Sequence, residues 1–124
     1  MKVILFGATG MIGQGVLREC LLDASVERVL VVGRASTGQT QEKLRELIHA
    51  NFFDFSSVAA ELSGDDACFF CLGVSSAGMT EEAYQRVTYD ITMAAAQTLV
   101  VQNPAWTTRP CFAWFADRRR LNAD

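Results

Sequence analysis

The sequence begins with a short apolar run that passes directly into a glycine-rich turn. Residues 3–6 read VILF and residues 7–13 read GATGMIG. A continuous run of branched and aromatic residues is typical of a strand buried on both faces of a parallel sheet. The apolar residues that follow recur at helical spacing, at Ile12, Val16, Leu17, Cys20 and Leu21. The sequence therefore predicts a strand over residues 2–7, a tight turn, and a helix from Met11 that packs on the sheet.

Further apolar runs and turn signals predict the remaining elements. Strands are expected over 28–33, within 47–53 and over 67–72. One helix is expected over 56–62, and a second from an N-cap at Thr80 to about Gln102, where Asn103-Pro104 ends it. Residues 34–43 are expected to form a loop, or a short helix at most. Strands that alternate with helices indicate parallel pairing with right-handed crossovers. We therefore expect an α/β, Rossmann-like doubly wound parallel sheet with strand order 3-2-1-4.

Composition excludes several classes of protein. The 124 residues are 50% hydrophobic and 20% charged, which suits one globular domain. The net charge of -3 gives no electrostatic reason to expect a nucleic acid or an anionic membrane as partner. No signal-peptide core or stretch of about 20 apolar residues is present, so we expect a cytoplasmic protein with free cysteines. The sequence is compatible with a homo-oligomer as well as with a monomer.

The glycine turn carries the strongest functional signal. In a turn between a strand and a helix, Gly7 permits the tight bend, Gly10 lets a diphosphate approach the backbone, and Gly13 lets the helix press against the sheet. The start of the helix then offers N–H groups to the negative charge. This arrangement predicts dinucleotide binding; a glycine turn that serves the fold alone is the alternative.

The segment GATGMIG resembles the fingerprint of extended and atypical short-chain dehydrogenases/reductases, which include epimerase/dehydratase-like and NmrA-like proteins. The resemblance covers residues 1–104 and implies an NAD(P)-binding Rossmann domain of an oxidoreductase. It also implies that the cofactor contacts the turn and the first helical residues, which are Gly7, Thr9, Gly10, Met11, Ile12 and Gly13.

Three further segments are predicted to contact the cofactor. Arg34 stands after the second strand, where an NAD-specific protein would usually present a carboxylate, so its guanidinium favours the 2′-phosphate of NADP over NAD. A solvated loop arginine is the alternative. Asn51 and Phe52 align with the family's adenine-contacting pair, although asparagine replaces the usual aspartate and is equally suited to a turn. The resemblance places Leu72, Gly73 and Val74 beside the nicotinamide ribose.

Catalytic residues are not identified. The family's Tyr-x-x-x-Lys pair is missing, because Tyr84 and Tyr89 are followed four positions later by Thr88 and Met93. No metal site is expected either: Cys68 and Cys71 are three apart on a strand and point to opposite faces. Three functions remain open: NADP-dependent hydride transfer with a small carbonyl or alcohol substrate, nucleotide sensing without catalysis as in NmrA-like proteins, and a nucleotide-independent interaction domain.

The resemblance ends at Pro104. Residues 105–124 are a divergent tail in which 111–116 is apolar enough to form a fifth strand beside the fourth. The alternative is a truncated or frame-shifted replacement of the family's continuation. We therefore divide the chain into an NAD(P)-binding domain, 1–104, and this tail, and we expect the fold to be incomplete relative to the family.

Overall fold

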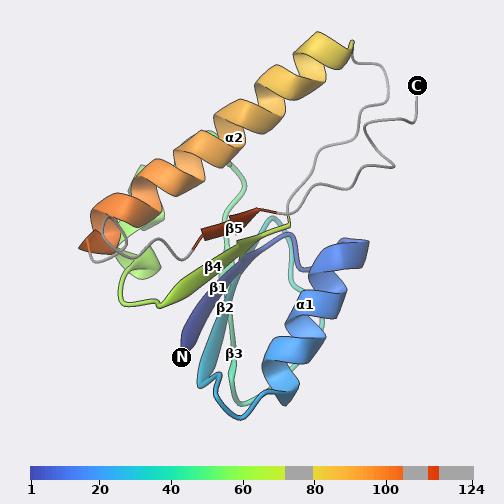
Figure 1. Ribbon diagram of the computed structural model, residues 1–124, viewed down its shortest axis with the longest axis vertical. Helices are drawn as coiled ribbons and strands as arrows, with labels where there is room; N and C mark the ends of the chain where they lie inside the picture. The colour runs from blue at the N-terminus through green and yellow to red at the C-terminus, as the bar shows by residue number, and fades with distance from the viewer. Residues whose placement is uncertain (72–79, 105–111, 115–124) are drawn as a thin grey trace.

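The computed structural model describes residues 1–71, 80–104 and 112–114 (Figure 1). In chain order its elements are β1 (Lys2–Phe6), α1 (Met11–Leu22), β2 (Arg28–Gly33), β3 (Leu44–Ile48), the 3-10 helix η1 (Ser56–Leu62), β4 (Ala67–Phe70), α2 (Glu81–Gln102) and β5 (Phe112–Trp114). None of the helices in these ranges is both long and apolar enough to cross a membrane.

The strands form one parallel sheet in the order β3-β2-β1-β4-β5. Phe6 at the end of β1 pairs with Val32 of β2 and with Phe70 of β4, so these three strands end at the same edge of the sheet. The predicted order 3-2-1-4 and the Rossmann-like class are confirmed. The structure also has β5 beside β4, as one of the two readings of the tail predicts.

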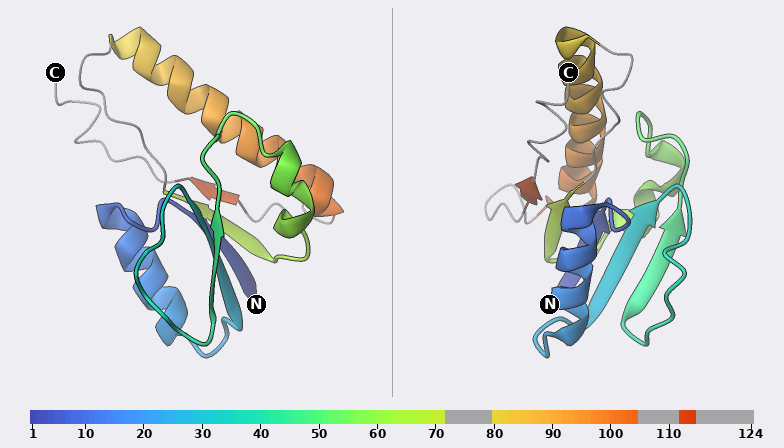
Figure 2. Two further views of the ribbon diagram at one scale, coloured as in Figure 1. Left: turned by 180° about the vertical axis from the view of Figure 1, so that it is seen from behind. Right: turned by 90° about the vertical axis from the view of Figure 1, so that its right-hand side faces the viewer.

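Each face of the sheet has its own core. Along β1, Ile4 and Phe6 point to the face covered by α2 and η1, where they join Phe55, Ile91, Ala95 and Leu99 in one buried cluster. Val3 and Leu5 point to the other face and pack with Leu17 and Cys20 of α1. Figures 1 and 2 show the sheet between these two helices. Strands buried on both faces explain why β1 and β2 have continuous apolar sequences.

The third strand was predicted too late in the sequence. It spans Leu44–Ile48, because pairing with β2 runs from Val29 opposite Leu44 to Gly33 opposite Ile48. The predicted segment from 51 onward forms a turn instead, closed by a hydrogen bond from Asp54 N–H to the Asn51 carbonyl oxygen at 3.3 Å. β3 lies at the edge of the sheet and is partly exposed, so it lacks the continuous apolar run of the buried strands.

The other boundaries differ less from the prediction. The strand predicted over 67–72 ends at Phe70, and residue 72 is outside the described residues. The helix over 56–62 is present as a 3-10 helix, and 34–43 contains no helix. Thr80 caps α2 as predicted, and its hydroxyl oxygen accepts a hydrogen bond from Ala83 N–H at 3.1 Å.

Buried Asn103 fastens the end of α2 to the edge of the sheet opposite the glycine turn. Its Nδ2 donates to the Leu62 carbonyl oxygen at 2.8 Å, and its Oδ1 accepts from Asp65 N–H at 3.1 Å. The Asp65 carboxylate accepts a hydrogen bond from the Arg28 guanidinium at 3.2 Å, and burial raises the pKa of Asp65. This polar cluster anchors α2 at the edge where the strands begin.

Candidate functional site

The turn between β1 and α1 needs glycine at two positions for the fold itself. Gly7 has φ +83°, a conformation that side-chain-bearing residues rarely adopt. At Gly13, a Cβ atom would lie 1.8 Å from the Gly7 carbonyl oxygen, which is a severe clash with backbone. The first turn of α1 therefore lies directly against the end of β1, as predicted from the spacing of these glycines.

Gly10 is different, because the fold does not require it to be glycine. It is the N-cap of α1 with φ -75° and ψ 170°, values open to any residue. Among the described residues, a Cβ there would meet only the Gly7 carbonyl oxygen, at an ordinary contact distance of 3.6 Å. This part of the chain thus leaves space beside Gly10 for a ligand to approach the start of the helix.

The start of α1 lacks the side-chain cap that many helices have. Its N-cap residue, Gly10, has no side chain to accept a hydrogen bond from the first turn, and no acidic residue lies in that turn. The N–H of Gln14 bonds to the Gly10 carbonyl oxygen at 2.9 Å, and its side chain braces the turn by donating to the Thr9 carbonyl oxygen at 2.8 Å. Ile12, 37% exposed, and Met11, 67% exposed, stand at the positive end of the helix dipole. A helix start with a glycine N-cap and no acidic residue, at the carboxyl edge of a parallel sheet, fits a diphosphate.

Arg34 lies at the same edge, immediately after the last residue of β2. Its side chain is exposed, and its guanidinium carbon lies 5.8 Å from the centroid of the Phe52 ring. Arg34 forms no ion pair within the described part of the chain. The structure therefore offers an uncompensated cation, supported by an aromatic ring, where a ribose phosphate was predicted.

Asn51 and Phe52 have structural tasks of their own. The Asn51 side-chain oxygen accepts a hydrogen bond from Phe53 N–H at 3.0 Å, which is the turn-forming role that the sequence left open. Phe52 is only 8% exposed and stacks on Phe55 with centroids 5.9 Å apart. Phe52 belongs to the core beneath Arg34, so the structure brings Phe52 and Arg34, both predicted to contact the cofactor, close together.

No motif in the sequence marks Glu46, yet its carboxylate organises the connection after Arg34. It accepts hydrogen bonds from the Ser36 hydroxyl at 2.7 Å, from Thr37 N–H at 2.7 Å and from the Thr37 hydroxyl at 2.5 Å. These bonds, with those from Thr37 the largest cause, lower the pKa of Glu46. Neutral donors nine and ten positions earlier in the sequence carry no recognisable signature, so this contact could not be predicted.

The predicted nicotinamide contacts, Leu72, Gly73 and Val74, lie outside the described residues. The chain approaches them from the expected edge, because Cys71 N–H donates to the Phe6 carbonyl oxygen at 2.9 Å, next to the glycine turn.

The described residues contain no tyrosine–lysine pair. Tyr84 is buried, Tyr89 is 64% exposed, and both lie on α2. Lys43 donates instead to the carbonyl oxygens of Leu21 and Asp23 at the end of α1, at 3.3 and 2.9 Å. Lys2 opens β1 at the opposite edge of the sheet. Proton-transfer groups of the family's type are therefore absent from this part of the molecule.

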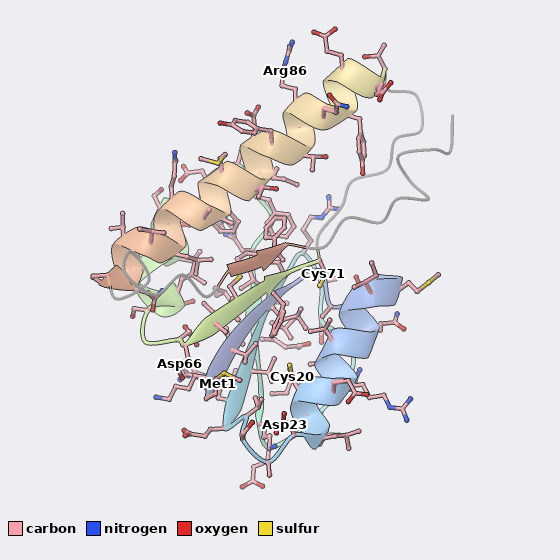
Figure 3. All side chains as sticks on the ribbon, viewed as in Figure 1. Met1, Cys20, Asp23, Asp66, Cys71 and Arg86 are labelled. Carbon is pink, nitrogen blue, oxygen red and sulfur yellow. The ribbon has the colours of Figure 1, made fainter. Side chains whose placement is uncertain are left out.

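The three cysteines that the structure describes are structural in character. Cys71 packs on the α1 side with Cys20 (Figure 3). Cys68 packs in the core on the α2 side, so the predicted opposite orientation of Cys68 and Cys71 is confirmed. Burial raises the pKa of Cys68 and raises the pKa of Cys71 to about 11, which disfavours thiolates. Within the described ranges no three histidine, cysteine, aspartate or glutamate side chains gather as metal ligands would.

Comparison with solved structures places this geometry among short-chain dehydrogenases and epimerases. A short chain dehydrogenase from Leptospira borgpetersenii with bound NAD+ is 16% identical, with a TM-score of 0.67 over 94% of this chain and 51% of that one. One from Francisella tularensis is 14% identical, with a TM-score of 0.65 over 82% and 46%. The UDP-N-acetylglucosamine 4-epimerase of Bacillus cereus is 14% identical, with a TM-score of 0.55 over 80% and 31%.

These likenesses show the fold, and the chain spans about a third to a half of the length of such structures. No curated protein sequence matches it. The model of the NAD dependent epimerase/dehydratase family matches residues 3–102, which include the glycine turn, Arg34 and both helices. The chain therefore belongs to the NAD-dependent epimerase/dehydratase family.

Proposed function

We propose that this chain binds a nicotinamide dinucleotide, with the diphosphate at the start of α1. The observation that carries the proposal is the glycine N-cap of α1, which supplies no side-chain cap and leaves a space that the described part of the fold does not fill. Membership of an NAD-dependent family and the bound NAD+ in the Leptospira dehydrogenase support it. Gly7, Gly13 and Thr9 shape the turn, and the residues after Gly10 direct their N–H groups at the phosphates.

We propose further that NADP is preferred over NAD. Arg34 is exposed, uncompensated within the described residues, and follows β2, where a 2′-phosphate would lie. A guanidinium can donate two parallel hydrogen bonds to a phosphate, whereas a 2′-hydroxyl gains little from it. The Asn51 amide nitrogen remains a candidate for the adenine edge, and Leu72, Gly73 and Val74 for the nicotinamide ribose.

We assign residues 1–104 as the cofactor-binding part of a cytoplasmic oxidoreductase of the short-chain type. A bound nicotinamide would supply the hydride acceptor or donor for a small carbonyl or alcohol substrate. This chain's own residues would bind and orient it; the proton-transfer group would have to come from residues other than the tyrosines and lysines described above.

The second candidate is nucleotide sensing without catalysis, in which binding changes a surface offered to another protein. The specific observation in its favour is that no tyrosine in the sequence is followed by a lysine four positions later.

Titration with NADPH and with NADH, followed by the fluorescence of the reduced nicotinamide, tests the proposal on the full chain. We expect NADPH to bind at least about tenfold more tightly, a difference of about 1.4 kcal/mol. Arg34→Ala should abolish that preference, and Arg34→Lys, which keeps the charge without the planar fork, should retain part of it. Failure of both nucleotides to bind below the millimolar range would refute both candidate functions.

Turnover separates the two functions. A panel of aldehydes, ketones and secondary alcohols with the preferred cofactor should give a measurable rate if the chain is an oxidoreductase. Binding without turnover across the panel would favour the sensing function.

A further inference from the structure

We propose that Glu46 is a positioning residue, which holds Arg34 in place for the 2′-phosphate of NADP. This inference rests on the proposed function and extends it, because it assigns part of the cofactor preference to a residue that does not touch the cofactor.

The first step concerns what orders the connection between β2 and β3. Residues 34–43 contain no helix, and Glu46 accepts three hydrogen bonds from Ser36 and Thr37. Each of the two hydroxyls also accepts a hydrogen bond from the N–H two residues later, Ser36 from Gly38 at 3.2 Å and Thr37 from Gln39 at 3.3 Å. Residues 36–39 are thus folded around a single carboxylate.

The second step concerns the rigidity of that carboxylate. Glu46 lies within β3, opposite Val31 of β2, so the sheet fixes its backbone. On one side of Arg34, Gly33 ends β2, and its carbonyl oxygen accepts from His49 N–H at 2.9 Å. On the other side, Ser36 and Thr37 are tied to Glu46. The backbone of Arg34 is therefore held within three residues on both sides.

The third step concerns the guanidinium itself. It lies over the Phe52 ring, which is buried and stacked on Phe55, so the side chain has a fixed support. Because the Glu46 carboxylate is engaged by neutral donors and forms no ion pair with Arg34, it does not compete with a phosphate for the guanidinium. An arginine held in this way loses less conformational entropy when it binds.

Glu46→Ala tests the proposal with two small probes, adenosine 2′,5′-bisphosphate and adenosine 5′-monophosphate, measured by isothermal titration calorimetry on the full chain. They differ only in the 2′-phosphate. We expect the variant to bind the bisphosphate about fivefold more weakly and to bind the monophosphate with unchanged affinity. A fivefold loss is about the net contribution of one hydrogen bond. Glu46→Gln, which keeps the side-chain length and one acceptor oxygen, should show a smaller loss.

The sign of the change separates positioning from simple electrostatics. Removing a negative charge near a phosphate site should strengthen binding by Coulomb's law. Glu42→Ala is the matched control, because Glu42 is an exposed glutamate in the same connection and its replacement by alanine removes the same charge. We expect Glu42→Ala to leave bisphosphate binding unchanged or to tighten it slightly, whereas Glu46→Ala should weaken it.

A double-mutant cycle completes the test. If Glu46 acts through Arg34, Glu46→Ala has no further effect on bisphosphate binding in the Arg34→Ala background. An equal loss in both backgrounds, an equal loss for both probes, or tighter binding as in the control would overturn the positioning role. If the wild-type chain does not distinguish the two probes, the NADP preference fails and the positioning role fails with it. Loss of discrimination in Arg34→Ala but not in either Glu46 variant rejects the positioning role alone.

Discussion

The two long helices of this molecule begin in opposite ways. α2 begins with Thr80, whose hydroxyl oxygen accepts the Ala83 N–H, and has two glutamates in its first turn. α1 begins with Gly10, without a side-chain cap and without an acidic residue in its first turn. Both helices pack on the same sheet, on opposite faces, so their burial does not explain the contrast.

Under the proposed function, the start of α2 serves the fold and the start of α1 serves a ligand. A capped start satisfies its N–H groups within the chain and contributes to stability. A start without a side-chain cap lacks that contribution, and its N–H groups suit an anion from outside the chain. Mutations at the two starts should therefore move stability and affinity independently of one another.

Gly13→Ala should have the largest effect and should abolish the start of α1 as a site. Its Cβ would lie 1.8 Å from the Gly7 carbonyl oxygen, so the helix must move away from β1. We expect a loss of about 3 kcal/mol in the free energy of unfolding, measured in urea, with dinucleotide binding lost as well.

Gly15→Ala is the matched control in the same helix. No atom of the residues that the structure describes lies within 4 Å of the Cβ that it would add. Alanine should therefore raise stability by roughly 0.5–1 kcal/mol and leave binding intact. A similar loss of stability and binding in both variants would mean that α1 tolerates no added side chain at either glycine. The effect at Gly13 would then not be due to its contact with the Gly7 carbonyl oxygen.

Gly10→Asp would give α1 the kind of start that α2 has. The backbone at Gly10 accepts any residue, and an aspartate there can cap the first turn and interact with the helix dipole. We expect the free energy of unfolding to rise by about 0.5 kcal/mol. Dinucleotide affinity should fall by at least about tenfold, since the carboxylate takes the donors and repels the diphosphate.

Gly10→Ser separates the two causes, because serine caps without charge. Its affinity should lie between those of the wild-type chain and Gly10→Asp. Undiminished affinity in Gly10→Asp would show that the start of α1 is not where the diphosphate binds.

Thr80→Ala changes the capped helix and should affect stability alone. Loss of the hydroxyl leaves the Ala83 N–H without its acceptor, which should cost about 1 kcal/mol in urea unfolding. Thr80→Ser keeps the cap and should be close to the wild-type chain. NADPH affinity should be the same in all three proteins; a parallel loss of affinity would contradict the division of roles between the helix starts.

The parts of the molecule that the sequence predicts well are those governed by local pattern. β1, α1 and β2 follow from continuous apolar runs and helical periodicity, and the strand order follows from parallel crossovers. The position of Arg34 could be predicted because it depends only on where β2 ends. β3 could not be placed as well, because an edge strand with half-exposed residues has the pattern of a loop.

The parts that the sequence does not predict depend on contacts between distant side chains. Phe52 fits an adenine contact as well as a core residue until its stacking on Phe55 is known. Glu46 resembles any surface glutamate until the hydroxyls of Ser36 and Thr37 are seen to bind it. Such contacts require the register of β3 against β2, which periodicity alone does not supply.

The smallest expected effect is the loss of stability when Glu46 is protonated in acid. It extends the comparison of the two helix starts to a residue that serves the proposed site without capping a helix. Hydrogen bonds from Thr37 and Ser36 lower the pKa of Glu46 in the folded chain, so their contribution to stability is complete above the ordinary glutamate pKa and is lost as the pH falls through the folded value. Between about pH 7 and about pH 3, the wild-type chain should therefore lose slightly more stability in urea than Glu46→Gln, by less than Thr80→Ala costs. The pKa values of Asp23 and Asp54 are also lowered, by bonds from Ser25 and Ser56 respectively, and these carboxylates titrate equally in both proteins. The difference between the two acid profiles thus belongs to Glu46, and identical profiles would mean that its charge does not hold the connection beside Arg34.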